Sequence, residues 1–255
     1  MVNPGNGLAK EPPDPGSDAP SEPISAVISD PLPGEALAEN VEGRAVTGPD
    51  DGFGKLWHKQ FWIRLEGVDV TPEGLVKNWK DRYTEFWPKG SHLYQPSGGL
   101  EEGDTAAADL AMIGGTRVGT GIRVIDEQPT SFTFATLEGH TLAGTITFSG
   151  KKDGDVTVAH VDVLMRASDP IYEIGMPLGG HHHENNFWKA SLRALARSYG
   201  IEAEPESKTQ SLDKRRKWAN ATNITENAFL HTAAYLVARP FRRLATSIRS
   251  RGTSS

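Results

Sequence analysis

The stretch GTRVGTGIRVIDEQPTSFTFATLEGHTLAGTITFSG, residues 115–150, decides the fold. Along three parts of it, apolar side chains recur at every second position, the pattern of strands with one buried face. Short turns rich in glycine and polar residues separate these parts, and short turns join antiparallel neighbours. The stretch therefore predicts three consecutive antiparallel strands, whose buried faces are formed by Val118, Ile122 and Val124, by Phe132 and Phe134, and by Leu142, Ile146 and Phe148.

Further strands are predicted on both sides of this stretch. The turn KKDGD leads into VTVAHVDVLMRAS, which aligns Ala159, Val161, Val163 and Met165 on one face. Upstream, QFWIRLEGVDV aligns Phe61, Ile63 and Leu65, and the pieces SHLYQP and AAADLAMI complete a set of about seven strands.

Two helices are predicted. In TPEGLVKNWKDRYTEFWP, Thr71 is placed to cap a helix and Pro72 to occupy its first position. The apolar positions of this helix are Leu75, Trp79, Tyr83 and Phe86, and Pro88 ends the run.

The second helix, over NNFWKASLRALARSYGI, is longer and amphipathic. Its apolar positions are Trp188, Leu192, Leu195 and Tyr199, and Gly200 ends it. The apolar face of a curved sheet must be buried against another element, and the apolar side of this helix can pack on it. The order predicts an α+β helix-grip fold, a curved antiparallel sheet of about seven strands packed on a long C-terminal helix.

Several short motifs carry a resemblance to a known superfamily. They are Val124–Glu127 at a strand end, the pair Phe132 and Phe134, the turn Thr136–His140, and Ser168–Pro170 before the last helix. Over residues 55–201 the chain resembles the START-like (SRPBCC) superfamily, and within it an uncharacterised bacterial group. The resemblance implies a helix-grip fold that holds an apolar ligand between sheet and helix, and it implies no catalytic residue.

The candidate ligand site follows from this arrangement. We expect an apolar small molecule or lipid between the sheet and the C-terminal helix, since small-molecule sites are mostly apolar. The alternative, that these side chains only fill the core, stays open. The candidate lining residues are Phe61, Ile63, Leu65, Trp79, Tyr83, Phe132, Phe134, Ile146, Phe148, Val161, Val163, Met165, Trp188, Leu192 and Leu195.

The run His181-His182-His183-Glu184 suggests a metal site. Consecutive helical residues point about 100° apart, so three adjacent histidines do not converge on a helix. In an extended loop His181 and His183 do converge, but a third ligand must come from elsewhere. We interpret the run as a helix start with exposed histidines and with Glu184 near the positive end of the dipole. No metal and no cofactor is expected.

Two other polar sets are candidate catalytic groups. His140 is either an acid or base at the cavity mouth or a turn residue bonded to backbone, and the latter is favoured. His160 and Asp162 alternate with apolar residues, which favours the solvent side of the sheet over a catalytic dyad. The piece GGTRVGTG lacks the Lys-Ser/Thr of a phosphate-binding loop. The favoured function is therefore binding. The alternatives are a cyclase- or hydrolase-like enzyme using His140 and a membrane-associated interaction protein acting through the basic tail.

Composition divides the chain of 255 residues into three parts. Residues 1–50 contain nine of the 17 prolines and no aromatic residue, so we expect a disordered acidic segment. Residues 51–204 form the predicted domain. Residues 205–255 contain ten bases and three acids, a basic tail. The absence of cysteine favours a reducing compartment, and no signal peptide or membrane span is apparent, so a cytoplasmic location is expected.

The basic tail contains a second amphipathic pattern, with its stripe formed by Leu230, Ala234, Val237, Phe241, Leu244 and Ile248. Arginines flank this stripe without acids among them. Residues 213–255 therefore suit an anionic membrane surface, which would make the protein peripheral to the membrane. Docking on the domain or on a partner is the alternative. Nucleic acid is not expected, because the domain is acidic and carries no recognised motif.

Overall fold

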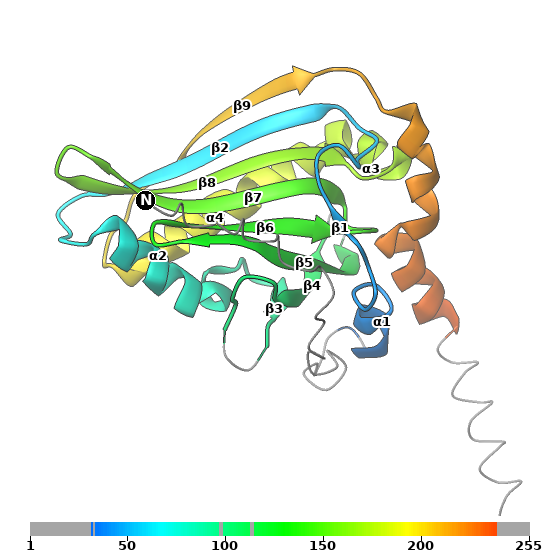
Figure 1. Ribbon diagram of the computed structural model, residues 1–255, viewed down its shortest axis with the longest axis horizontal. Coiled ribbons are helices and arrows are strands. Elements are labelled where there is room, and N and C mark those ends of the chain that lie inside the picture. The colour runs from blue at the N-terminus through cyan, green and yellow to red at the C-terminus, as the bar shows by residue number, and fades with distance from the viewer. Residues whose placement is uncertain (1–31, 33, 97–98, 113–114, 239–255) are drawn as a thin grey trace, which may run out of the picture.

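The computed structural model describes residues 32, 34–96, 99–112 and 115–238. Its strands form one antiparallel sheet in the order β3-β4-β5-β6-β7-β8-β2-β9, and β1 pairs with β6 beside this path (Figure 1). The strands are β1 Val46–Thr47, β2 Leu56–Leu65, β3 His92–Tyr94, β4 Thr105–Ala111, β5 Arg117–Gln128, β6 Ser131–Leu137, β7 Leu142–Asp153, β8 Val156–Ala167 and β9 Glu206–Asp213.

The strands follow the alternation of the sequence. In β2, Phe61, Ile63 and Leu65 are buried, while the residues between them are partly exposed. The strand β5 carries a register shift between Val124 and Asp126, which leaves Ile125 exposed at this irregularity. The strand β2 lies between β8 and β9, so the first long strand of the chain is an interior strand of the sheet.

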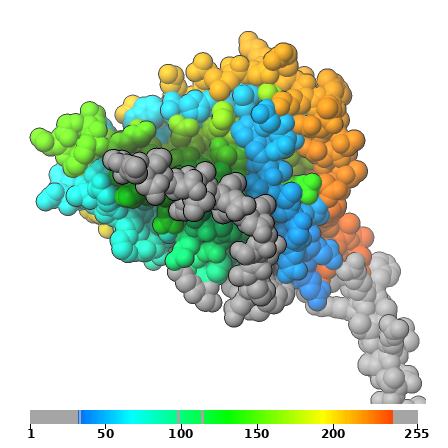
Figure 2. Space-filling model, in the orientation of Figure 1, coloured from blue at the N-terminus to red at the C-terminus, as the bar shows by residue number. Residues whose placement is uncertain are grey.

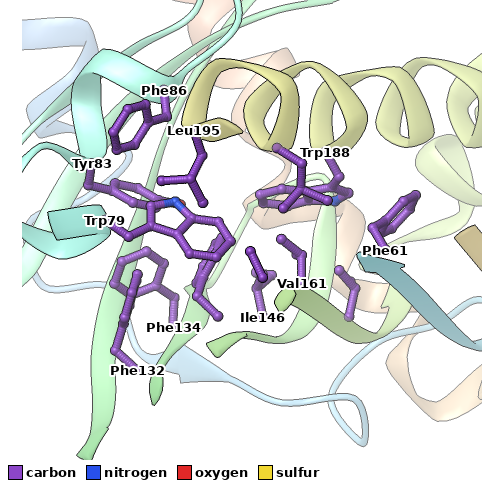
Figure 3. Packing of buried hydrophobic residues seen from close by; sticks show 14 of the residues in the cluster. Phe61, Trp79, Tyr83, Phe86, Phe132, Phe134, Ile146, Val161, Trp188 and Leu195 are labelled. Atoms are coloured by element: carbon purple, nitrogen blue, oxygen red, sulfur yellow. The ribbon is translucent and has the colours of Figure 1, made fainter. Parts of the chain in front are cut away.

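Two helical segments cover one face of the sheet. The helix α2, Pro72–Asp81, is capped at its N-terminus by Thr71, whose side chain accepts a hydrogen bond from the amide of Gly74. The short helix η2, Tyr83–Phe86, follows it. The helix α4, His181–Ser198, lies across the sheet behind it in Figure 1. Aromatic side chains from α2, η2, β6 and β7 pack between these layers (Figure 3). The predicted helix-grip α+β fold is thereby confirmed.

The structure differs from the prediction at the edges of the domain. Nine strands are present in the described residues instead of about seven. The additional strands, β1 and β9, fall outside the predicted boundaries of 51 and 204. The strand β9 is polar and exposed, so it lacks the apolar alternation that identifies a strand, and backbone pairing with β2 holds it.

The segment before residue 51 is ordered from residue 34 onward, contrary to the expectation for 1–50. The helix α1, Gly34–Ala38, packs on the sheet face opposite α4, where Leu37 and Val41 meet Ala107 and Leu137. Small residues on β5 make room, because a Cβ at Gly119 would lie 3.2 Å from Leu37. The absence of aromatic residues does not indicate disorder in this part of the segment, because short aliphatic side chains are sufficient to pack against a strand that contains glycines. Residues 1–31 lie outside the described residues.

The predicted basic tail packs against the domain in its described part. After β9 come the short helix η5, Trp218–Glu226, and a helix over residues 228–238. Its buried positions are Ala228, Thr232 and Tyr235, and Thr232 accepts a hydrogen bond from Asn40 at 3.1 Å. Figure 2 shows these two distant parts of the chain side by side, in blue and orange to red.

The predicted apolar stripe of the tail faces away from this contact. Leu230, Ala234 and Val237 are exposed, whereas the remainder of the stripe, Phe241, Leu244 and Ile248, lies outside the described residues. No helix in the described ranges has the length and hydrophobicity needed to span a bilayer.

Candidate functional site

A cavity of about 270 Å³ lies between the sheet and α4. Its wall combines the inward face of β4 to β7, the helical segments η2 and α4, and the turn that precedes α4. Most of its side chains are apolar. The residues that line it are Tyr83, Trp87, Ser91, Ala108, Leu110, Ala111, Met112, Thr116, Val118, Ile122, Phe134, His140, Thr141, Leu142, Ile146, Tyr172, Gly175, Met176, Gly180, His183, Glu184, Phe187, Trp188 and Phe229.

The candidate ligand residues divide between this cavity and the core. Tyr83, Phe134, Ile146 and Trp188 line the cavity. The others do not line the cavity and belong to the buried cluster of the core, in which Figure 3 labels Phe61, Trp79, Phe132, Val161 and Leu195. The remaining members of this set are Ile63, Leu65, Phe148, Val163, Met165 and Leu192. Phe132 and Phe148, for example, stack with ring centroids 4.8 Å apart.

Several lining residues were not predicted. Ala108 and Leu110 share the inward parity of β4, a signal that was present in AAADLAMI. Tyr172 and Met176 come from α3, Pro170–Gly175, and the kinked turn η4, Met176–Gly180, which have no clear periodicity. Phe229 comes from the tail, which sequence patterning placed outside the domain.

A buried ion pair lies at the edge of the cavity. Lys59 is 0% exposed, on the same face of β2 as Phe61. Its Nζ donates hydrogen bonds to Glu184 Oε2 at 2.6 Å and to Asn185 Oδ1 at 2.9 Å. Burial raises the pKa of Glu184, and the Lys59 charge opposes this. The expectation that Glu184 only complements a helix dipole was wrong, because it neutralises a cation beneath α4.

The histidine run lies in the first turn of α4, which begins four residues earlier than predicted. His181 packs edge-on against Trp57 at 4.6 Å, and His183 Nε2 lies 2.9 Å from the carbonyl oxygen of Ala111. Burial, with Lys59 and Lys55 nearby, lowers the pKa of His181 to about 4. Only His182 is exposed, so the prediction of three exposed histidines was wrong. No group of three metal-ligating side chains occurs in the part of the chain that is described.

His140 lies in the turn between β6 and β7 and lines the cavity. Its Nδ1 lies 3.0 Å from the amide nitrogen and 3.1 Å from the carbonyl oxygen of Leu142. The side chain is therefore held by backbone, as the favoured interpretation predicted. Burial lowers its pKa to about 4, so the imidazole is neutral at pH 7.

The pair His160 and Asp162 lies on the face of the sheet opposite the cavity. Asp162 Oδ1 lies 2.8 Å from His58 Nε2, and Asp162 Oδ2 accepts from Gln60 at 2.9 Å. His160 instead stacks on Trp62. The two residues do not form a catalytic dyad.

The buried histidine makes stability depend on pH. The pKa of His140 is about 4 in the folded state against 6.5 for a free imidazole, so the unfolded chain binds more protons between these values. Stability therefore falls as pH drops, by about 2 kcal/mol for this group between pH 7 and pH 5. Urea denaturation at pH 7 and pH 5 measures how much the free energy of unfolding decreases between the two. In His140→Asn this decrease should be smaller than in the wild type by that amount, whereas in the exposed control His182→Asn it should equal the wild-type decrease. Equal losses in all three proteins would contradict this origin.

The fold and the cavity define the class of protein: a helix-grip α+β protein with an apolar cavity between its sheet and its long helix. No family model and no curated protein sequence matches the chain.

Solved structures with a similar arrangement exist. Ms6760 from Mycobacterium smegmatis is 8% identical over 58% of this chain and 93% of its own, with a TM-score of 0.41. The di-domain ARO/CYC StfQ of the steffimycin pathway is 10% identical over 60% of this chain and 54% of its own, with a TM-score of 0.45. The major latex-like protein 151 of Panax ginseng is 11% identical over 57% of this chain and 98% of its own, at 0.39. None of these similarities assigns a ligand to this chain.

Proposed function

We propose that this protein binds an apolar small molecule or lipid in the cavity between sheet and α4, as a START-like binding domain. The observation that carries the proposal is the cavity itself, which has a volume of about 270 Å³ and is lined mostly by apolar side chains. This volume is close to the lower end of the roughly 300–1,000 Å³ that small-molecule pockets span.

The lining determines what the cavity accepts. Leu110, Ile122 and Phe187 supply apolar surface, and burial of a ligand against such surface contributes about 25 cal/mol per Å² before ordering costs. The charge of Glu184 is offset by Lys59 at 2.6 Å, so the wall does not demand a cationic ligand. An uncharged, mainly hydrocarbon or aromatic molecule fits best.

The neutral His140 gives this site one polar contact. Because the Leu142 peptide occupies Nδ1, Nε2 is the ring nitrogen left for a hydroxyl or carbonyl group of the ligand. A pKa of about 4 makes this imidazole a weak base at pH 7, which favours binding over an enzymatic role for His140.

Filling the cavity tests the proposal. Ala108, on β4, is 1% exposed and lines the cavity, so Ala108→Leu places additional methyl groups in the empty space. We expect the full-length variant to bind the neutral fluorophore N-phenyl-1-naphthylamine at least tenfold more weakly than the wild type in a fluorescence titration.

The matched control is Leu192→Met, a volume-conserving change in the same core at a position that does not line the cavity. Its affinity should stay within twofold of the wild-type value. A folded Ala108→Leu protein that binds the fluorophore as tightly as the wild type would rule out the cavity as the binding site. Native mass spectrometry of the wild type then identifies any co-purified ligand.

A further inference from the structure

Tyr83 brings a polar group to the aromatic part of the cavity wall. It begins η2, is 2% exposed and lines the cavity. Its ring packs edge-to-face against the rings of Trp87, Phe134 and Phe148, with centroids 6.1, 5.1 and 5.3 Å away (Figure 3). The hydroxyl is the polar end of a side chain whose ring is otherwise surrounded by aromatic carbon.

The hydroxyl hydrogen of Tyr83 has no acceptor among the residues that the structure describes. A phenol can donate one hydrogen bond, and a buried one usually does. Burial raises the pKa of Tyr83, and the Trp87 side chain alone is close enough to oppose this shift. An indole N–H only donates, so Trp87 cannot accept the phenol hydrogen. Trp87 Nε1 itself makes no hydrogen bond within the described ranges.

An acceptor for this hydroxyl can come from the contents of the cavity. Because burial raises the pKa of Tyr83, the phenol keeps its hydrogen at neutral pH and is a donor. A buried donor without a partner destabilises the protein, and a ligand that supplies the partner removes this penalty. The penalty therefore favours ligands that carry an acceptor at this point.

Tyr83 and His140 contact different parts of the cavity. Tyr83 packs on Phe134 inside β6, whereas His140 lies beyond Leu137, where β6 ends, and is bonded to Leu142. At about 3.3 Å per residue, the three steps from Phe134 to Leu137 span roughly 10 Å. The Tyr83 hydroxyl is therefore a second polar contact, separate from that of His140.

We propose that Tyr83 selects the ligand by donating a hydrogen bond to a carbonyl oxygen, so that the cavity prefers an aromatic ketone to the corresponding hydrocarbon. This inference rests on the proposed function, because it names the ligand class of the same cavity. A ligand hydroxyl would bring a hydrogen that the surrounding rings cannot accept, whereas a carbonyl brings only an acceptor. Phe187 and Trp188 also line the cavity, and they suit a flat aromatic body.

The test is isothermal titration calorimetry of the full chain with 2-acetylnaphthalene and 2-ethylnaphthalene, which differ in the carbonyl oxygen. We expect Tyr83→Phe to bind the ketone about tenfold more weakly than the wild type, because the carbonyl loses its donor. Its affinity for the hydrocarbon should stay within twofold, which also shows that the cavity is intact.

The matched control is Tyr199→Phe, which removes the same atom from a residue at the C-terminal end of α4 that does not line the cavity. Its affinities for both compounds should stay within twofold of the wild-type values. A ketone affinity that falls equally in Tyr83→Phe and Tyr199→Phe would overturn the proposal, because the loss would then not depend on the cavity wall.

The stability of the ligand-free protein provides a second measurement. Tyr83→Phe should have a urea midpoint equal to or above that of the wild type, because the deleted hydroxyl has no partner in the described structure. A lower midpoint would overturn the proposal, since the hydroxyl would then be bonded within the protein.

Two outcomes of the titrations separate this inference from the proposed function. If the wild type binds both compounds and Tyr83→Phe binds the ketone equally well, the role of Tyr83 is overturned while the cavity remains the binding site. If the wild type binds neither compound, the proposed function fails, and the ligand class fails with it.

Discussion

Glu184→Leu is expected to lower the free energy of unfolding by about 3–5 kcal/mol, the usual cost of removing one partner of a buried ion pair. Lys59 is completely buried, and its Nζ would keep only the Asn185 oxygen at 2.9 Å. The double variant Lys59→Met/Glu184→Leu should recover most of the loss, because it removes both charges and leaves apolar side chains of similar size. Urea denaturation followed by tryptophan fluorescence measures all three proteins.

The other single change, Lys59→Met, should destabilise the protein less at acid pH than at alkaline pH. Burial already raises the pKa of Glu184 in the wild type, and loss of the opposing Lys59 charge raises it further. An acid with a raised folded-state pKa loses stability as pH rises above its unfolded pKa, about 4.3 for glutamate. The deficit of Lys59→Met relative to the wild type should therefore be larger at pH 8 than at pH 5. A deficit that grows toward pH 5 would mean that the carboxyl is not the destabilised group.

Gly144→Ala should lower the free energy of unfolding by about 3 kcal/mol, which is in the upper part of the range observed when atoms are added to a packed interior. A Cβ at this position of β7 would lie 2.2 Å from the carbonyl oxygen of Leu164 and 2.8 Å from the Cα of Met165. Both atoms are backbone of the neighbouring β8, so no side-chain rotation relieves the contact.

Gly48→Ala provides the matched control for this position, because the nearest atom to a Cβ there is a side-chain oxygen of Asp51 at 3.7 Å. Its midpoint in urea should stay close to that of the wild type. A Gly144→Ala protein as stable as this control would show that β7 and β8 can separate without cost.

Most of the fold was predictable because its interior strands and α4 each bury one face. Period-two alternation located β2 and β5 to β8, and helical spacing located α2 and α4. The strand β9 was not predictable, since its residues are mostly exposed on both faces and only its backbone pairs with β2. Pairing through the backbone alone does not require apolar side chains at alternate positions, so hydrophobic periodicity does not detect it.

The candidate site was predictable only in part. Periodicity identifies which side chains face inward, but it does not distinguish core from cavity wall. Trp188 lines the cavity whereas Leu192, one turn later, is packed in the core. The ion pair had a signal, because Lys59 shares the parity of Phe61 and a lysine at an inward position needs a partner. Phe229 had none, since its place depends on where the tail docks.

The position of β2 has a consequence for synthesis of the chain. This strand leaves the ribosome before every strand of the sheet except β1, yet its two neighbours are β8 and β9. One edge of β2, which carries Phe61, Ile63 and Leu65, stays unpaired until β8, Val156–Ala167, has been synthesised. The other edge stays unpaired until β9, which ends at Asp213, has been synthesised. Pairings between such distant segments form slowly and leave apolar strands accessible in the meantime. The nascent chain is therefore expected to depend on chaperones until β9, Glu206–Asp213, has emerged.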